Sequence, residues 1–225
     1  MKMEVAALVA AYNEAATIAA VVRGVQPFVS KVLVVDDGST DATGEVARSA
    51  GAHVIAHEVN RGKGHAVRTG LKNLLSGPAT HIVFLDGDLQ HLPEETPRLL
   101  EAARVSEADV VIGERSFDRT RMPASRYHTN RIGSRALSWF VGVPVGDTQC
   151  GFRVFRTDVL RRMELSSTGY EIETEMLVKL RRLGGRIAST PITAVYGGQR
   201  SNLRPIRDTT RTCFLAVYYR FLQRV

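Results

Sequence analysis

The 225-residue sequence predicts an α/β protein with a doubly wound, mainly parallel sheet and helices on both faces. Short runs rich in Val, Ile and Leu alternate with segments of roughly ten to fifteen residues whose apolar positions recur at helical spacing. This alternation covers about the first 115 residues. Parallel strands need helical crossovers, which cover both faces of the sheet and keep the strands apolar along their length. The remaining residues show a less regular pattern, and we expect a single domain.

The first strand is expected at 3–10, an apolar run. A helix follows, because apolar residues recur at helical spacing from Ile18 to Val25. Asn13 is the N-cap expected for that helix.

The later elements repeat this pattern. Further strands are expected at 31–35, 53–56, 81–85, 110–112, 151–155 and 186–195. Further helices are expected after Asp41 to a stop at Gly51, at 64–75, 93–103, 136–141 and 171–183, and from Asp208 onward. A basic loop is expected between 114 and 135.

The composition of the chain indicates which class of binding partner and which redox compartment to expect. Lysine and arginine number 30 against 23 acidic residues, and the net charge of +7 favours anionic partners such as nucleotides, lipid head groups or nucleic acid. Cys150 and Cys213 show no paired spacing and are typical of thiols in a reducing compartment. The apolar N-terminal run is interrupted by Glu4 and Glu14, which disfavours a signal peptide. No run approaches the ~20 apolar residues of a spanning helix, so we expect any membrane contact to be peripheral.

Two acidic clusters follow predicted strands. "VVDDGSTD" (34–41) ends the second strand and "HIVFLDGDLQHLP" (81–93) contains the fourth. Ligands of an open parallel sheet bind beyond the carboxyl ends of its strands, so both clusters are expected in one site. Carboxylates this close repel one another unless they share a cation or a proton. Mg²⁺ or Mn²⁺, held jointly with substrate phosphates, is the expected cation.

Closely spaced acidic residues also occur in other kinds of site. Gln90 is expected to supply a further oxygen, and His91 is either a ligand or a hydrogen-bonded surface residue. A calcium-binding EF-hand loop is excluded, because His91 and Pro97 occupy the positions that need Gly and Glu. A dehydrogenase-type dinucleotide site is excluded, because "AAYNEAATIA" lacks the glycine fingerprint. A phosphatase of the haloacid-dehalogenase type is disfavoured. Its Asp-x-Asp motif ordinarily ends the first strand and continues into Thr, whereas "FLDGDL" here ends the fourth strand and continues into Gln90.

Four motifs in order carry a family resemblance: "AAYNE" (10–14), "VVDDGSTD" (34–41), "NRGKGHA" (60–66) and "FLDGDLQHLP" (84–93). Together they resemble the inverting family-two glycosyltransferases of the GT-A fold, and more closely the dolichyl- and polyprenyl-phosphate hexosyltransferases. The resemblance extends to about Arg200. It implies one GT-A domain over 1–225, with a nucleotide-sugar half at about 1–115, an acceptor half at about 116–200 and a basic amphipathic helix at 206–225.

The resemblance implies roles for individual residues. Asp37 hydrogen-bonds the nucleobase, Arg115 touches the donor diphosphate, and Asp88 and Asp147 join Arg115 as catalytic residues. The metal ligands implied are Asp86, Asp88 and Gln90. The nucleotide-binding residues implied are Ala11, Tyr12, Glu14, Asp37, Gly38, Lys63 and Asp86. The family usually has proline where Ala10 or Ala11 stands.

Two acceptors stay open. "GDTQCGFRVF" (146–155) resembles the acceptor-side segment and places Asp147 toward the sugar. A hydroxyl acceptor needs a general base, for which Asp147, Glu171 and Glu173 are candidates. A lipid phosphate, with a second pKa near ~6, is already an oxyanion and needs none. By resemblance, Arg131 and Arg200 contact that phosphate.

The resulting hypothesis is transfer of a hexose from GDP-mannose or UDP-glucose to a polyprenyl phosphate, with Mg²⁺ or Mn²⁺. The alternative is transfer to a hydroxyl of a polysaccharide, cell-wall precursor or small metabolite; the absence of a QxxRW motif disfavours a polysaccharide synthase. A nucleic-acid partner is not expected, because the donor motifs stand complete. The last helix is expected to lie on a membrane surface, in the core or in a dimer contact. The expected protein partner is a second copy of the chain or a membrane protein. The expected location is cytoplasmic, peripheral on the inner face of the membrane.

Overall fold

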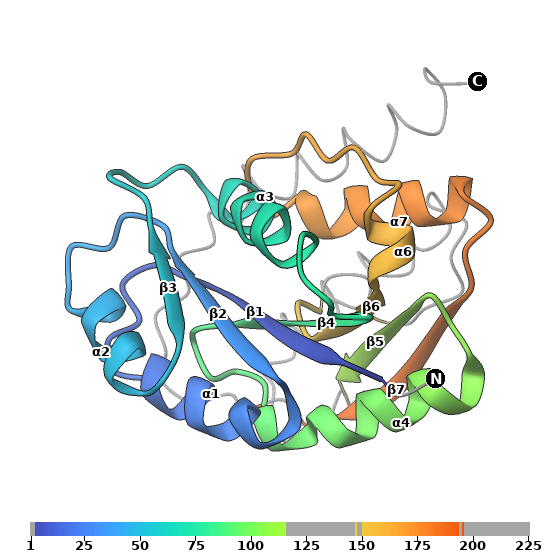
Figure 1. The fold of residues 1–225 in the computed structure, drawn as a ribbon, viewed down its shortest axis with the longest axis horizontal. Helices are drawn as coiled ribbons and strands as arrows, with labels where there is room; N and C mark the ends of the chain where they lie inside the picture. Colours follow the sequence, from blue (N-terminus) through green and yellow to red (C-terminus); the bar gives the residue numbers. More distant parts are fainter. Residues whose placement is uncertain (1–2, 116–146, 148–149, 194, 196–225) are drawn as a thin grey trace, which may run out of the picture.

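A computed structural model of the chain describes residues 3–115, 147, 150–193 and 195 (Figure 1). Its centre is a seven-stranded sheet in the order β3-β2-β1-β4-β6-β5-β7. The strands are β1 (Val5–Ala11), β2 (Lys31–Asp36), β3 (His53–Ala56), β4 (His81–Asp86), β5 (Val110–Arg115), β6 (Arg153–Arg156) and β7 (Ile187–Ile192). Only β6 runs antiparallel to its neighbours β4 and β5. The prediction of an α/β fold with a mainly parallel sheet is confirmed.

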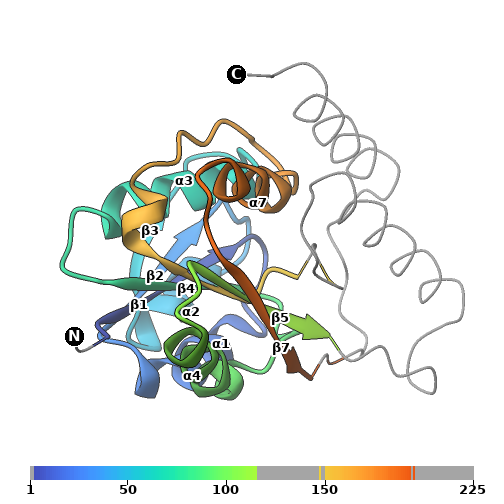
Figure 2. The same ribbon diagram turned by 90° about the vertical axis from the view of Figure 1, so that its right-hand side faces the viewer.

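Helices cover both faces of this sheet (Figures 1 and 2). The α-helices are α1 (Ile18–Val25), α2 (Thr43–Ser49), α3 (Lys63–Leu74), α4 (Thr96–Ser106), α6 (Thr157–Leu160) and α7 (Ile172–Arg182). The described residues also contain two 3₁₀ turns, η1 (Gln26–Phe28) and η2 (Pro93–Glu95). Helices α3, α6 and α7 lie on one face, and α1, α2 and α4 lie on the other.

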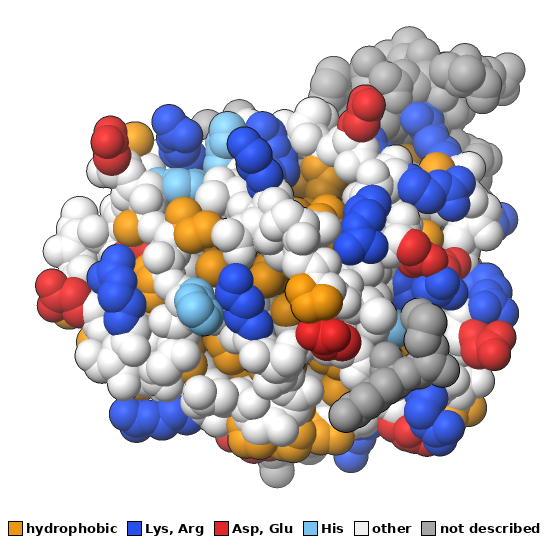
Figure 3. All heavy atoms as spheres, in the orientation of Figure 1, with side chains coloured by type: hydrophobic (Ala, Val, Ile, Leu, Met, Phe, Trp, Pro, Cys, Tyr) orange, Lys and Arg blue, Asp and Glu red, His pale blue; other side chains and the backbone are white. Residues whose placement is uncertain are grey.

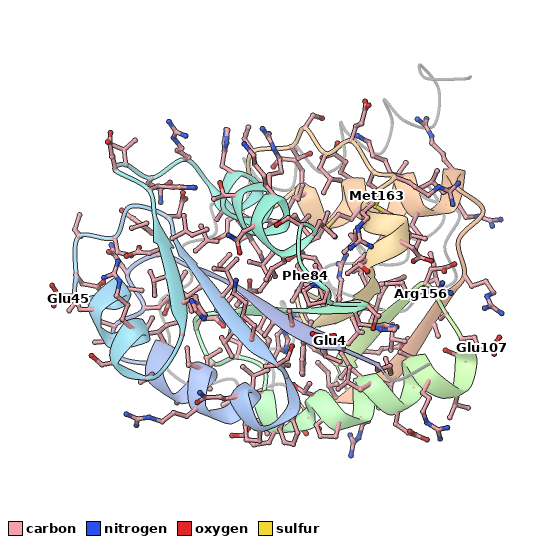
Figure 4. The ribbon with its side chains drawn as sticks, viewed as in Figure 1. Glu4, Glu45, Phe84, Glu107, Arg156 and Met163 are labelled. Atoms are coloured by element: carbon pink, nitrogen blue, oxygen red, sulfur yellow. The ribbon has the colours of Figure 1, made fainter. Side chains whose placement is uncertain are left out.

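Apolar residues on both sides of the central strands form the core. Six of the seven residues of β1 are buried, as are five of the six of β2. Phe84 of β4, labelled in Figure 4, packs edge-on against Phe155 of β6, and their ring centroids are 5.5 Å apart. The second half of the chain therefore joins the sheet of the first half through β6.

The predicted N-cap of the first helix is wrong. Helix α1 begins at Ile18, and the residue before it is Thr17. Asn13 instead adopts a left-handed backbone with φ of 57°, and its side-chain oxygen accepts a hydrogen bond from Thr40 N at 2.8 Å. Asparagine tolerates this conformation, so it serves the loop between strand and helix instead of the helix end.

Other boundaries follow the sequence more closely. Gly51 ends the α2 region with φ of 100°, as predicted. The helix expected at 93–103 begins as the 3₁₀ turn η2 and continues as α4. The short helix α6 was not predicted, because four residues carry too little periodicity to be recognised. The helices expected at 136–141 and from Asp208 lie outside the described residues.

The surface drawn in Figure 3 carries mixed charge, with Lys and Arg side chains interspersed among Asp and Glu. Several of the exposed arginines are in ion pairs, among them Arg104 with Glu101 at 2.6 Å and Arg156 with Asp158 at 2.5 Å. No helix in the described part of the chain has both the length and the apolar character needed to cross a membrane.

The contact between α3 and β1 generates a stability prediction. A Cβ atom added at Gly70 would overlap the side chain of Leu8, which is 1% exposed. We expect Gly70→Ala to lower the free energy of unfolding by about 1–3 kcal/mol, because overpacking outweighs the gain in helix propensity. Urea denaturation measures the change. Asn73→Ala, at an exposed position of the same helix, is the control and is expected to change stability little; equal stability of wild type and Gly70→Ala would contradict this packing.

Candidate functional site

Three parallel strands end side by side at one edge of the sheet. Strands β1, β2 and β4 end at Ala11, Asp36 and Asp86. In the register of the sheet Ala11 lies beside Asp36, and Ala10 lies beside Asp86. The segments that follow these strands therefore meet, as the sequence predicted from the rule for parallel sheets.

Backbone and side-chain hydrogen bonds tie these segments together. Glu14 N donates to Thr43 Oγ1 at 2.8 Å, which links the loop after β1 to α2. Thr17 Oγ1 donates to Gly87 O at 2.7 Å, which links it to the turn after β4. Of the predicted nucleotide-binding residues in these loops, Ala11 is buried, and Tyr12, Glu14 and Gly38 are partly exposed at this edge.

Asp37 organises a neighbouring loop. Its Oδ1 lies 2.7 Å from His57 Nδ1 and accepts a hydrogen bond from Arg61 N at 3.1 Å, and its Oδ2 accepts one from Gly62 N at 2.7 Å. His57 Nε2 in turn lies 3.0 Å from Thr69 Oγ1 on α3. Asp37 is 3% exposed. It therefore closes the loop from His57 to Gly62, and its bond to a nucleobase stays a prediction.

The edge concentrates negative charge. Burial and the nearby Asp88 raise the pKa of Glu14 to about 7. Burial and the nearby Asp86 raise the pKa of Asp88 to about 6. The pKa of Asp86 is lowered in spite of burial, because the Lys63 ammonium lies beside it. Glu14 and Asp88 thus carry the uncompensated charge of the cluster.

Lys63 joins the two halves of the chain. Its Nζ lies 2.6 Å from Asp86 Oδ1 and 2.6 Å from Glu173 Oε1, and 5.5 Å from the centre of the Tyr170 ring. Burial opposes its charge, but Asp86 and Glu173 raise its pKa. Its predicted contact with the nucleotide stays a prediction; in the structure its charge is shared between these two carboxylates. The sequence offered no signal for the partner, since Lys63 and Glu173 are 110 residues apart.

The residues at this edge fit a divalent cation. Asp88 has no ion-pair partner among the described residues and accepts a hydrogen bond from Gln90 N at 3.0 Å. Carboxylate and amide oxygens are ligands that Mg²⁺ and Mn²⁺ prefer. Within the described ranges, no group of three or more His, Cys, Asp or Glu is arranged to hold a metal alone. The remaining ligands would be substrate phosphates and water. The assignment of Asp86, Asp88 and Gln90 as ligands stays a prediction.

Arg115 and Asp147 lie together. The guanidinium donates through Nε to Asp147 Oδ2 at 2.5 Å and through a terminal nitrogen to Oδ1 at 2.9 Å. Asp147 is fully buried, while the Arg115 side chain is 15% exposed. A carboxylate with both oxygens on one guanidinium is not presented to an acceptor hydroxyl, so this geometry does not favour Asp147 as a general base.

His91 lies behind the acidic turn. Its ring stacks on Phe152 at 6.0 Å, and its Nε2 lies 3.7 Å from Cys150 Sγ. Burial and the nearby Arg115 lower its pKa to about 4, so the ring is neutral at physiological pH. His91 is buried at 7% exposure, which corrects the alternative that it is a surface residue. Its Nδ1 has no partner among the described residues.

The other candidate bases have structural contacts. Glu171 Oε1 accepts hydrogen bonds from Thr168 N at 3.3 Å and Gly169 N at 3.1 Å. Thr168 O accepts one from Gly64 N at 2.9 Å, so this loop rests on the first turn of α3. Glu173 binds Lys63, as described above. The predicted phosphate contacts Arg131 and Arg200, and the helix at 206–225, lie outside the described residues.

The fold and this site can be compared with known proteins. The model of the family described as Glycosyl transferase family 2 matches residues 6–163. The chain belongs to glycosyltransferase family 2. The chain is therefore a glycosyltransferase, as the motifs predicted.

Curated relatives agree with this family. The glycosyltransferase AglJ of Haloferax volcanii is 36% identical over 218 residues, which cover 93% of this chain and 69% of AglJ. The undecaprenyl-phosphate mannosyltransferase of Micrococcus luteus is 35% identical over 206 residues, which cover 86% of this chain and 84% of that protein.

A solved structure agrees with the fold. Glucosyl-3-phosphoglycerate synthase from Mycobacterium tuberculosis, in complex with Mn²⁺, UDP-glucose and phosphoglyceric acid, matches with a TM-score of 0.74. The match covers 97% of this chain and 79% of that one at 24% identity. It confirms the predicted GT-A fold.

The raised pKa of Asp88 generates a prediction for this family 2 glycosyltransferase. Its folded-state pKa of about 6 lies above the ordinary 3.8, so the ionised form costs stability above pH 6, and the cost shrinks as the pH falls toward 3.8. We expect Asp88→Asn to stabilise the metal-free protein at pH 7.5 by on the order of 2 kcal/mol, roughly 4–8 °C in Tm, and by about half as much at pH 5.

Thermal unfolding in the presence of a chelator measures this effect at both pH values. Glu45→Gln is the control, because Glu45, labelled in Figure 4, is an exposed acid on α2 with no ion pair among the described residues. A gain in Tm that is equal at pH 5 and pH 7.5 would contradict the assignment of repulsion to Asp88.

Proposed function

We propose that this protein transfers a hexose, with inversion, from a nucleoside diphosphate sugar to a polyprenyl phosphate. The observation that carries the proposal is the uncompensated Asp88 carboxylate where β1, β2 and β4 end together. A divalent cation, Mg²⁺ or Mn²⁺, would balance this charge and, when bound, stabilise the diphosphate leaving group. GDP-mannose and UDP-glucose are the proposed donors.

The donor half supplies binding and orientation. Asp88 and Gln90 would hold the cation, and the loops that contain Tyr12 and Asp37 would hold the nucleoside. Asp37 fixes the loop from His57 to Gly62 next to the end of β2, because His57 Nδ1, Arg61 N and Gly62 N all contact its carboxylate. Such prearranged contacts reduce the entropy lost when the donor binds.

The chemistry of a phosphate nucleophile and the names of the relatives both support a polyprenyl phosphate acceptor. An oxygen of a phosphate monoester attacks the anomeric carbon, the bond from that carbon to the nucleoside diphosphate breaks, and the configuration inverts. This oxygen is already anionic near neutral pH, so no general base is required. The bidentate pairing of Asp147 with Arg115 is consistent with a base-free reaction. The Micrococcus luteus relative is named an undecaprenyl-phosphate mannosyltransferase, and undecaprenyl phosphate belongs to this class of acceptor.

A lipid acceptor would bring the protein to a membrane. We propose a peripheral location on the cytoplasmic face, with the arginine-rich residues 206–225 as the contact. Arg131 and Arg200 would balance the charge of the acceptor phosphate.

The deciding experiment supplies the purified protein with Mn²⁺, a short polyprenyl phosphate and a panel of nucleotide sugars. Mass spectrometry of the organic extract is expected to detect a lipid-phosphate hexose from one donor, absent with chelator. Asp88→Asn is expected to lose turnover at least ~100-fold while its fold persists, because it loses a metal ligand. Full activity of that variant would contradict the metal assignment. Release of nucleoside diphosphate and free sugar without glycolipid would contradict the lipid acceptor and favour a hydroxyl acceptor.

The acceptor arginines generate a second prediction. Arg200→Ala is expected to raise KM for the polyprenyl phosphate at least ~10-fold with little change in nucleotide affinity, because a charge-assisted contact to the phosphate is lost. Steady-state kinetics with either substrate varied separates the two effects. Arg23→Ala, which removes an exposed arginine from α1, is the control. Equal losses for donor and acceptor would argue against an acceptor role for Arg200.

A further inference from the structure

A cleft opens at the edge of the sheet opposite the one where β1, β2 and β4 end. Its volume is about 630 Å³, which is within the range of small-molecule binding sites. Strand β4 runs from His81, which lines the cleft, to Asp86 at the other edge. A strand rises ~3.3 Å per residue, so the cleft lies roughly 17 Å from the acidic residues of the donor site. It is therefore a separate place on the molecule.

Segments that are distant in the sequence line this cleft. They are the turn after α3, the end of α4 and the residues around the start of α6, and Arg186 lies just before β7. Ala79, Ala103 and Ala108 are buried there. Because alanine side chains are short, they leave the cleft open.

Positive charge exceeds negative charge in the lining. The charged side chains there are Arg104, Arg156, Arg161, Arg186, Glu107 and Asp158. Arg156 and Glu107 are labelled in Figure 4. Each of the two acids pairs with one of these arginines, and Arg104 pairs with Glu101, which lies outside the lining. Arg161 has no carboxylate within 4.0 Å among the described residues, so its charge is not balanced.

Arg161 is nevertheless held in place by uncharged oxygens. Its Nε and Nη2 donate to Leu75 O at 3.3 and 3.2 Å, and its Nη1 donates to Thr157 Oγ1 at 3.2 Å. A guanidinium carries five N–H groups, and these bonds use three of them. The side chain therefore offers a full positive charge and two further donors in a fixed position, which suits an anion.

His81 offers an acceptor in the same cleft. Its Nδ1 lies 2.9 Å from Thr80 Oγ1. That hydroxyl donates to Glu4 O and accepts from Glu4 N, both at 3.0 Å, so His81 Nδ1 is the donor to it. Burial and the nearby Arg156 lower the pKa of His81, so the ring is neutral at pH 7 and its Nε2 is an acceptor. This acceptor and the two acids of the lining suit hydroxyl groups.

We propose that the cleft binds a small phosphate monoester that also carries hydroxyl groups, such as a sugar phosphate. The phosphate is balanced by Arg161, and the hydroxyls donate to His81 Nε2 and to the acids of the lining. This site is distinct from the donor and acceptor sites of the proposed function, and the inference does not depend on them.

The first test is calorimetric titration with glucose 6-phosphate, in a chelator and without nucleotide. Without metal the acidic donor site repels a phosphate. We expect one saturable site with a Kd below ~1 mM, and no binding of glucose. Arg161→Met is expected to weaken binding at least ~5-fold, because a charge-assisted contact is lost. Absence of saturable binding by the wild type would overturn the proposal.

The matched control is Arg162→Met. Arg162 is the next residue, is exposed and does not line the cleft. This variant has the same net charge as Arg161→Met and is expected to bind as the wild type does. Equal losses in the two variants would show attraction to the overall charge of the protein and would overturn the site.

A second variant tests the hydroxyl contact. His81→Phe keeps a ring and removes Nε2. It is expected to weaken binding of glucose 6-phosphate at least ~3-fold and to leave the affinity for inorganic phosphate unchanged, because only the sugar phosphate has hydroxyls to donate. Equal losses for both ligands would contradict the role of His81.

A lipid head group could supply the same chemistry, and vesicles distinguish the two sources. Co-sedimentation with phosphatidylcholine vesicles that contain phosphatidylinositol 4-phosphate is expected to be the same for Arg161→Met and Arg162→Met. A loss of co-sedimentation in Arg161→Met alone would assign the cleft to a head group and overturn the soluble ligand. Hexose transfer by Arg161→Met is expected to equal that of the wild type, so failure of this proposal and failure of the proposed function are distinguishable.

Discussion

Repulsion between carboxylates at one edge of the sheet is the constraint on which the rest of the site depends. Parallel pairing of β1 with β2 and β4 brings three strand ends together, and the acids that follow these strands cannot separate. The protein balances Asp86 with Lys63 and leaves Asp88 and Glu14 with raised pKa values. A site with surplus negative charge is costly in the free protein and favourable once a cation arrives.

The elements around this edge connect the predicted donor half of the chain to the predicted acceptor half. Helix α3 supplies Lys63, and the loop before α7 rests on the first turn of α3 through the bond from Gly64 N to Thr168 O. Glu173 then follows at the start of α7. The second half of the chain also enters the central sheet as β6 and β7. A change in the position of α7 would therefore alter the ion pairs around Lys63 and Asp86.

Two pairs show that side chains predicted to contact substrate also have structural contacts. Asp37 closes the loop from His57 to Gly62, and Arg115 holds Asp147 in a bidentate ion pair. In each case the group predicted to contact substrate is fixed by a protein partner before substrate arrives. Such fixed groups reorganise little when the substrate binds, which favours catalysis.

The sequence by itself determined the alternating strands and helices of the first 115 residues, the edge at which the acidic clusters meet, and the family. These follow from short-range patterns: apolar periodicity, strand ends and motif order. The sequence did not predict α6, because four residues carry too little periodicity. It also placed the N-cap of the first helix at Asn13, whose side chain instead accepts a hydrogen bond from Thr40 N in the loop. Only the tertiary structure decided that Lys63 pairs with Glu173, that Asp37 pairs with His57 and that His91 is buried. Each of these depends on which distant elements pack together, and local sequence spacing does not encode that.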